Sequence, residues 1–184
     1  MSQLFPSLPD APLLADVFRR FPAAVRPLLE LNDVVMRGES ELSVAQRELI
    51  AAYVSSLNAC RFCLDAHVVF ARAHGIPEPL VAAMLEDLDS AGVDDRLRPI
   101  LQYVRKLTLS PSRMVEADAR AVHDAGWSEE ALFDAVQVCA VFNLMNRIVE
   151  GTGVQPLPAT DEADDSALPR MDSYVDFGRR IGVI

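Results

Sequence analysis

Residues 48–67 read Glu-Leu-Ile-Ala-Ala-Tyr-Val-Ser-Ser-Leu-Asn-Ala-Cys-Arg-Phe-Cys-Leu-Asp-Ala-His. This stretch contains two of the three cysteines, one of the three histidines, and a carboxylate among apolar neighbours. Two thiols with acid and base groups beside them are what thiol redox chemistry requires. We therefore take Glu48, Cys60, Cys63 and His67 as the candidate site.

The chain around this stretch has helical periodicity, and no convincing alternating strand is present. We predict an all-α fold, a helical bundle built around a helical hairpin that carries the Cys-x-x-Cys motif. Ser43 and Gln46 have the spacing of a capping box at the start of the hairpin. The predicted helices cover residues 12–19, 23–37, 44–57, 61–74, 78–87, 95–109, 116–125 and 129–150.

A chain of 184 residues fits one compact domain. We predict a single all-helical domain over residues 1–153, with the motif core at about 42–153, and a C-terminal tail over residues 154–184. Prolines and acidic residues between Val154 and Pro169 indicate an extended linker. The apolar residues that follow must cover a surface, either of their own domain or of a neighbouring subunit. A neighbouring subunit is the preferred prediction.

The net charge of −10 argues against a nucleic-acid partner or an anionic membrane surface, because both attract clustered Lys and Arg. The N-terminus lacks the pattern of a signal peptide, and no stretch approaches eighteen uninterrupted apolar residues. A reducing cytoplasm is the expected compartment. There a close cysteine pair is more often catalytic or metal-binding than a permanent disulfide.

Cys60, Cys63 and His67 stand at i, i+3 and i+7, which places them on one face of a helix that Asn58 is predicted to cap. Thiols in a first helical turn are favoured as thiolates by the helix macrodipole. The sulfurs are close enough to bond, so that one can attack and the other resolve. His67, one turn beyond Cys63, can take up its proton.

Glu48 is predicted to be partly buried, with a raised pKa and a need for a polar partner. Its neighbours one turn away are all apolar or small: Val44, Ala45, Ala51 and Ala52. If the hairpin bends at residues 57–59, Glu48 and His67 each lie roughly 13 Å from the bend, at ~1.5 Å per residue. The spacing thus brings carboxylate, imidazole and thiols to one seam between helices.

Alternatives remain at each position. Glu48 is also compatible with a structural ion pair, for which Arg147 and Arg105 are candidates. Cys60, Cys63 and His67 are compatible with three ligands of a zinc site, although Cys139 is too isolated among apolar residues to be a fourth.

A second polar cluster is formed by Asn143, Asn146 and Arg147, at i, i+3 and i+4. It fits either a buried hydrogen-bond network or a lining of the thiol pocket.

The pattern Glu-x11-Cys-x2-Cys-x3-His on two consecutive helices resembles the core motif of the alkylhydroperoxidase D-like (AhpD-like) proteins in the carboxymuconolactone decarboxylase superfamily. The stretch Phe142-Asn-Leu-Met-Asn-Arg-Ile-Val-Glu-Gly-Thr-Gly153 is similar to the Asn-Arg segment of its peroxidase-related subgroup. Together the two segments cover most of the chain between Leu42 and Gly153.

The resemblance implies an all-helical homo-oligomeric peroxidase with no metal and no cofactor, whose partners are a hydroperoxide substrate and a dithiol reductant (a protein or a lipoamide-like molecule). It implies that Cys63 is peroxidatic, that Cys60 is resolving, and that Glu48 and His67 form a proton relay. Well-known members carry a further histidine just before the second cysteine, where this chain has Phe62. Rival functions are a carboxymuconolactone decarboxylase-like enzyme, for which two cysteines are not needed, and a non-enzymatic redox-sensing or zinc-stabilised protein.

Overall fold

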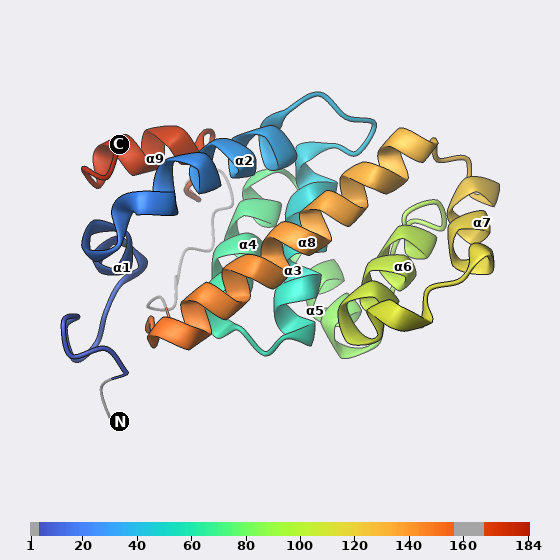
Figure 1. Ribbon diagram of the computed structural model, residues 1–184. Helices are drawn as coiled ribbons and strands as arrows, with labels where there is room; N and C mark the ends of the chain where they lie inside the picture. Colours follow the sequence, from blue (N-terminus) through green and yellow to red (C-terminus); the bar gives the residue numbers. More distant parts are fainter. Residues whose placement is uncertain (1–3, 157–167) are drawn as a thin grey trace.

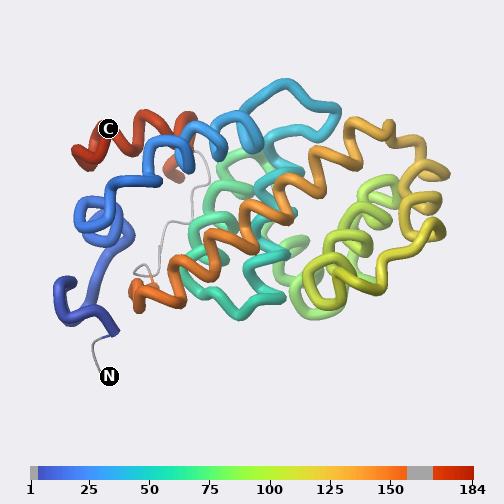
Figure 2. The backbone as a smooth tube through the Cα atoms, in the orientation of Figure 1, coloured from blue at the N-terminus to red at the C-terminus, as the bar shows by residue number. Residues whose placement is uncertain are grey.

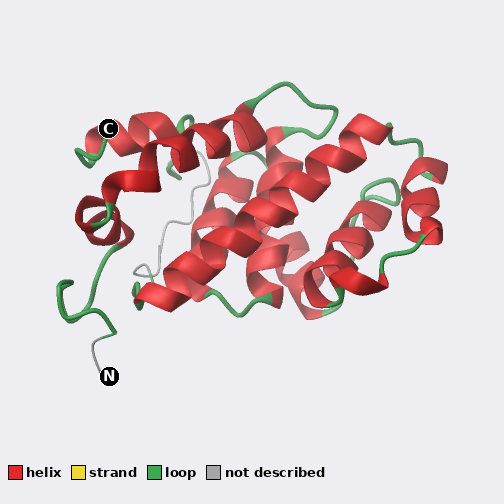
Figure 3. Ribbon diagram, in the orientation of Figure 1, coloured by secondary structure: helices red, strands yellow, loops and turns green. Residues whose placement is uncertain are grey.

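The computed structural model describes residues 4–156 and 168–184, and every regular element within them is helical (Figures 1 and 3). The predicted all-α fold is therefore confirmed. The α-helices are α1 Leu14–Arg20, α2 Val25–Arg37, α3 Val44–Leu57, α4 Arg61–Ala73, α5 Glu78–Glu86, α6 Arg98–Leu109, α7 Glu116–Asp124, α8 Glu129–Thr152 and α9 Tyr174–Arg180. Two short 3-10 turns, Pro22–Ala24 and Pro111–Arg113, lie between helices.

All eight predicted helices are present. The largest difference between a predicted and an observed helix boundary is at the start of α6, which begins at Arg98 rather than Asp95. The predicted capping box also forms at the start of α3. The Ser43 hydroxyl accepts from the Gln46 N–H at 3.2 Å, and the Ser43 N–H donates to the Gln46 side chain at 2.9 Å.

The hairpin of α3 and α4 is the most extensive helix pair, and α8 crosses it diagonally (Figure 1). α3 also packs on α6, so it lies at the centre of the core, where Leu49, Ile50 and Val54 are almost fully buried. Among the described helices only α8 has the length and composition to cross a membrane. Of its most apolar window, 50% is buried inside the protein.

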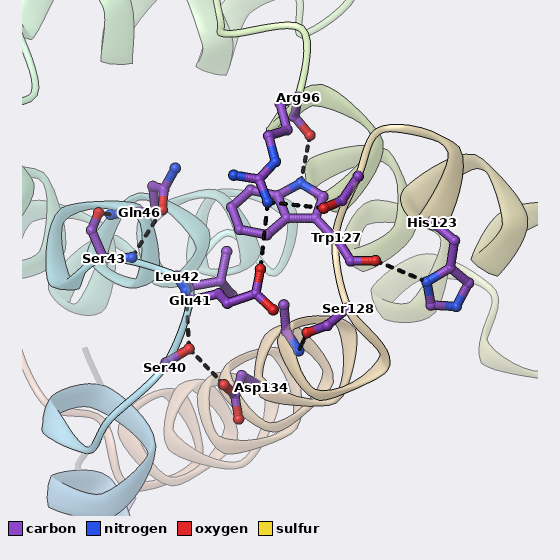
Figure 4. A network of polar contacts seen from close by, with 12 residues as sticks. Ser40, Glu41, Leu42, Ser43, Gln46, Arg96, His123, Trp127, Ser128 and Asp134 are labelled. Atoms are coloured by element: carbon purple, nitrogen blue, oxygen red, sulfur yellow. Dashed lines mark hydrogen bonds and ion pairs between the residues drawn. The ribbon is translucent and has the colours of Figure 1, made fainter.

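A polar network fixes the end of the bundle distant from the thiols (Figure 4). The Arg96 guanidinium lies 3.8 Å from the centre of the Trp127 ring and donates to the Gly126 carbonyl at 2.9 Å. The Trp127 indole in turn donates to the Arg96 carbonyl at 2.7 Å. Ser40 donates to Asp134 at 2.5 Å and so ties the loop before α3 to α8.

The C-terminal segment forms α9, which was not predicted as a helix and packs beside α2 of its own chain (Figures 1 and 2). The approach is close. A Cβ added at Gly178 would lie 2.5 Å from Leu29 Cδ1 of α2, so the Leu29 side chain would have to shift to accommodate a larger residue. The predicted linker lies largely outside the described residues, and the preferred subunit contact stays a prediction.

Candidate active site

A tight turn positions the two cysteines. α3 ends at Leu57, Ala59 adopts a left-handed φ of 55°, and the Cys60 N–H donates to the Ser55 carbonyl at 2.9 Å. The predicted cap at Asn58 is wrong, because Cys60 itself occupies the N-cap position of α4 and Asn58 turns towards α8. Cys63 lies in the first turn of α4, near the positive end of the helix dipole.

Glu48 is fully buried, with 0% of its side chain exposed, and it bridges two cationic or hydrogen-bonding partners. Its Oε2 lies 2.5 Å from His67 Nδ1, and its Oε1 accepts from Arg37 Nη2 at 2.5 Å. The hairpin thus brings Glu48 and His67 together as its geometry predicts. The ion-pair partner is Arg37 rather than Arg147 or Arg105.

The predicted raised pKa of Glu48 is wrong in sign. Burial does act to raise this pKa, but the charges and hydrogen bonds of His67 and Arg37 outweigh it and hold the pKa below its ordinary value. Because an ionised carboxylate can only accept hydrogen bonds, the hydrogen shared with His67 belongs to Nδ1. The second ring nitrogen, Nε2, forms no hydrogen bond within the described residues, so it can accept or donate a proton in a reaction.

The two thiols differ in their surroundings. Cys60 is 0% exposed and Cys63 is 4% exposed, and both lie against an apolar cluster that includes Val17 and Val149. The Cys60 S–H donates to the Cys63 sulfur. This hydrogen bond, reinforced by burial, raises the pKa of Cys60. The same bond lowers the pKa of Cys63, against the opposing effect of burial. Cys63 is therefore the sulfur favoured as a thiolate.

The asparagines of α8 join this helix to the hairpin in a hydrogen-bond network, as the first interpretation of the polar cluster predicts. The second interpretation is wrong, because Asn143, Asn146 and Arg147 are not among the residues that line the cavity beside Cys63. Asn58 donates to Asn146 at 2.9 Å and to Asn143 at 3.1 Å, and Asn146 donates to Ser55 at 3.0 Å. The Asn146 side chain also hydrogen-bonds the Cys63 sulfur and lowers its pKa. Arg147 has no such role, since it lies on the exposed side and binds Asn143.

A cavity of about 200 Å³ opens beside Cys63 and His67. Cys60 is not among its lining residues, so only one of the two sulfurs faces this space. Phe62, which lies between the two cysteines in the sequence, forms part of the wall. The complete lining comprises Leu14, Phe18, Leu29, Asn32, Phe62, Cys63, Ala66, His67, Phe70, Phe142, Met145, Met171, Tyr174 and Phe177.

The described residues offer no set of side chains that could bind a metal ion. Among the described residues, no three His, Cys, Asp or Glu side chains are grouped to hold an ion. The imidazole of His67 is instead enclosed by aromatic rings, with Phe142 at 4.2 Å between ring centres and Phe70 at 5.6 Å.

Two residues of the site were not predicted. Arg37 lies on α2 and Tyr174 on α9, far from the motif in the chain. No spacing rule links them to Glu48. The only sequence signal for Tyr174 was the apolar character of the C-terminal segment.

Replacing Asn146 with alanine should raise the pKa of Cys63, because the thiolate loses a hydrogen-bond donor. The pH dependence of Cys63 alkylation by iodoacetamide measures this, and its midpoint should move to higher pH. Asn143→Ala is the matched control, since Asn143 belongs to the same network without a bond to Cys63. Equal midpoints in both variants would contradict the role given to Asn146.

The fold and the hairpin that carries the two cysteines define a class of small all-helical proteins. Comparisons with known proteins indicate the same class. The sequence pattern of the carboxymuconolactone decarboxylase family matches residues 22–106, which include all four candidate residues. The uncharacterized protein YdfG of Bacillus subtilis (strain 168) is 28% identical over 110 residues, covering 60% of this chain and 75% of YdfG.

Two solved structures superimpose over 84% of this chain. One is an uncharacterized peroxidase-related protein from Silicibacter sp. TM1040, with a TM-score of 0.73, 26% identity and 78% of that chain covered. The other is an uncharacterized peroxidase-related protein with an alkylhydroperoxidase AhpD core, from Ralstonia eutropha JMP134, with a TM-score of 0.75, 23% identity and 80% of that chain covered. Residues 22–106 are thus similar to the carboxymuconolactone decarboxylase family, and the fold is similar to that of AhpD-like, peroxidase-related proteins of known structure.

Proposed function

We propose that the protein is a thiol-dependent hydroperoxide reductase that uses Cys63 as its peroxidatic and Cys60 as its resolving cysteine. One observation supports this proposal most strongly. Cys63 faces the cavity beside His67, whereas Cys60 is fully buried outside the cavity lining and is hydrogen-bonded to the Cys63 sulfur. The substrate can reach one sulfur only, and the second is in place to react with whatever forms on the first.

The proposed first step is attack of the Cys63 thiolate on the terminal oxygen of a hydroperoxide. The S–O bond forms as the O–O bond breaks, which gives a sulfenic acid and an alkoxide. His67 Nε2 takes the proton that Cys63 loses and returns it to the alkoxide, which leaves as an alcohol. Glu48 holds the imidazole in the required orientation through Nδ1.

In the second step the Cys60 thiol attacks the sulfenic sulfur, which yields a Cys60–Cys63 disulfide and releases water. An external dithiol then reduces the disulfide by two thiol exchanges and becomes a disulfide itself. Cys60, Cys63 and Cys139 are all free thiols in the structure, which is the state ready for the first step. We propose a reducing cytoplasm as its setting and a homo-oligomer as its form.

A decarboxylase of the same superfamily is a weaker candidate. The substrate of a decarboxylase carries a carboxylate, which a binding site neutralises with Lys or Arg. Neither residue lines the described cavity, whose walls are almost entirely apolar. A redox sensor would share the dithiol but would not turn over.

A coupled assay separates these functions. Hydroperoxide consumption is followed with dithiothreitol or dihydrolipoamide as reductant, across a series of organic hydroperoxides. The proposal predicts sustained consumption with one alcohol formed per hydroperoxide. A single oxidation without turnover would indicate a sensor, and no thiol oxidation at all would contradict the proposal.

A further inference from the structure

A carboxylate that the steps above do not use lies beside the resolving cysteine. The pKa of Cys60 is raised by its hydrogen bond to Cys63, by burial, and also by a side-chain hydrogen bond with Glu150 of α8. The Cys60 S–H therefore has two acceptors within reach, the Cys63 sulfur and the Glu150 carboxylate.

The register of α8 accounts for this contact. Asn146 is hydrogen-bonded to the turn between α3 and α4, at 2.9 Å and 3.0 Å, so this part of α8 faces that turn. One helical turn further on, Val149 is 0% exposed and packs in the cluster that contains both cysteines, and Glu150 is its neighbour. The same stretch of α8 thus presents an amide to Cys63 and a carboxylate to Cys60.

Glu150 connects a buried thiol to the solvent. Cys60 is 0% exposed and does not line the cavity, whereas Glu150 is an exposed residue. His67, the proposed base of the first step, faces the cavity beside Cys63. Besides the two cysteines, the buried cluster around Cys60 has only apolar members within the described residues: Leu8, Val17, Val149 and Val154. A proton that leaves Cys60 can therefore reach bulk water through Glu150.

The charge of Glu150 is unfavourable for the first step. The hydrogen bond from Cys60 lowers the pKa of Cys63, and the negative charge of Glu150 acts in the opposite direction. A carboxylate is useful in the second step, because Cys60 keeps its proton until a base removes it. Once Cys63 is oxidised it is no longer a thiolate, which leaves Glu150 as the charged acceptor for the Cys60 S–H.

We propose that Glu150 is the general base of disulfide formation and accepts the proton of Cys60 as this thiol attacks the Cys63 sulfur. The inference rests on the proposed function where the attacked sulfur is a sulfenic acid. The S–S bond then forms as the S–O bond of Cys63 breaks, and the Cys60 proton moves to the Glu150 carboxylate. The departing hydroxide takes up one proton from solvent and Glu150 returns one to solvent, so one water molecule is formed overall.

A peroxide-free assay isolates this step. Dithiodipyridine, a small uncharged disulfide, reacts with the Cys63 thiolate to give a mixed disulfide and one thiopyridone. Cys60 then attacks the Cys63 sulfur, which forms the Cys60–Cys63 disulfide and releases a second thiopyridone while Glu150 takes the proton. Stopped-flow absorbance follows the two releases as two phases. Every protein carries Cys139→Ser so that only the pair reacts, and Cys60→Ser, which should release one equivalent, identifies the first phase.

Glu150→Gln should slow the second phase about 10²-fold and leave the first phase no slower. Its remaining second-phase rate should rise more steeply with pH than that of the parent protein, since hydroxide must then remove the Cys60 proton. Glu150→Asp keeps a carboxylate and should be slowed less. Glu130→Gln is the matched control, because Glu130 is exposed at the opposite end of α8, and both phases should be unchanged.

The substitution of an exposed side chain by its amide should leave the fold intact, which circular dichroism checks. Equal second phases in the parent protein and Glu150→Gln, equal slowing of both phases, or the same pH slope in both proteins would overturn the inference. Release of only one thiopyridone by the parent protein would overturn it as well.

Failure of this inference and failure of the proposed function are distinguishable, since dithiodipyridine is not a peroxide. If the second phase depends on Glu150 and no hydroperoxide is consumed, the reductase proposal fails while Glu150 keeps its role. If hydroperoxides are consumed and the second phase does not depend on Glu150, only this inference fails. When both hold, cumene hydroperoxide, which is reduced to 2-phenyl-2-propanol, should leave a longer-lived Cys63 sulfenic acid in Glu150→Gln for dimedone to trap.

Discussion

Replacement of Cys63 with serine is expected to reduce hydroperoxide consumption by on the order of 10³-fold or more, because a hydroxyl cannot replace the thiolate as nucleophile. Cys63 is the sulfur that faces the cavity, and the hydrogen bond from Cys60 lowers its pKa. The substitution changes one atom at a helix start, so the fold should persist. Steady-state consumption with a dithiol reductant measures the effect, and circular dichroism checks the fold.

The other two cysteines provide matched controls. Cys139 is buried in α8, where it lies 3.3 Å from the Thr108 hydroxyl and does not line the cavity, so Cys139→Ser should remain active. Cys60→Ser should still react once and should then keep a sulfenic acid on Cys63 that dimedone traps. Activity retained in Cys63→Ser, or lost equally in Cys139→Ser, would refute the assignment of the nucleophile.

Replacement of Glu48 with glutamine should lower the free energy of unfolding by about 3 kcal/mol. Glu48 is fully buried and accepts from both His67 and Arg37. Glutamine has nearly the same shape, but its amide N–H₂ would face one of these donors and leave it without an acceptor. Urea denaturation measures the change. Glu41→Gln is the control, since its exposed pair with Arg96 is worth no more than about 1 kcal/mol.

The same carboxylate gives the stability a defined pH dependence. Because the pKa of Glu48 is lowered by folding, its stabilisation is fully present above its ordinary pKa of 4.5 and is lost as pH falls through the lower pKa of the folded state. The wild-type protein should therefore lose stability below pH 4.5 more steeply than Glu48→Gln. Parallel pH profiles for the two proteins would show that Glu48 is not held ionised.

Glu48→Gln should also slow hydroperoxide consumption about 10²-fold, since the imidazole of His67 loses the acceptor that orients it. Disulfide formation by a strong oxidant should still occur, because the two thiols are unchanged.

The sequence was sufficient for the hairpin and for the contact between Glu48 and His67. Both follow from local rules: apolar periodicity defines α3 and α4, and equal distances from the bend put two residues at the same height. The family motif was recognised because its residues lie within one short stretch. The position of Cys63 near the helix start followed from the same spacing.

The parts that were wrong or absent depend on packing between distant segments. Arg37 reaches Glu48 only because α2 packs near α3, and its charge adds to the larger effect of His67 in lowering the pKa of Glu48. Tyr174 enters the cavity only because α9 docks on α2 at Gly178. Asn58 was predicted as a cap from its residue type, yet its amide binds α8 instead. No periodicity within one segment encodes these contacts.

A single-turnover experiment identifies the sulfurs that react with a hydroperoxide. Reduced protein is mixed with one equivalent of cumene hydroperoxide, and its thiols are located by peptide mass mapping while the organic product is quantified. We expect a disulfide between Cys60 and Cys63, a free Cys139, and one molecule of 2-phenyl-2-propanol per disulfide. Unoxidised Cys60 and Cys63 beside intact hydroperoxide, or oxidation confined to Cys139, would contradict it.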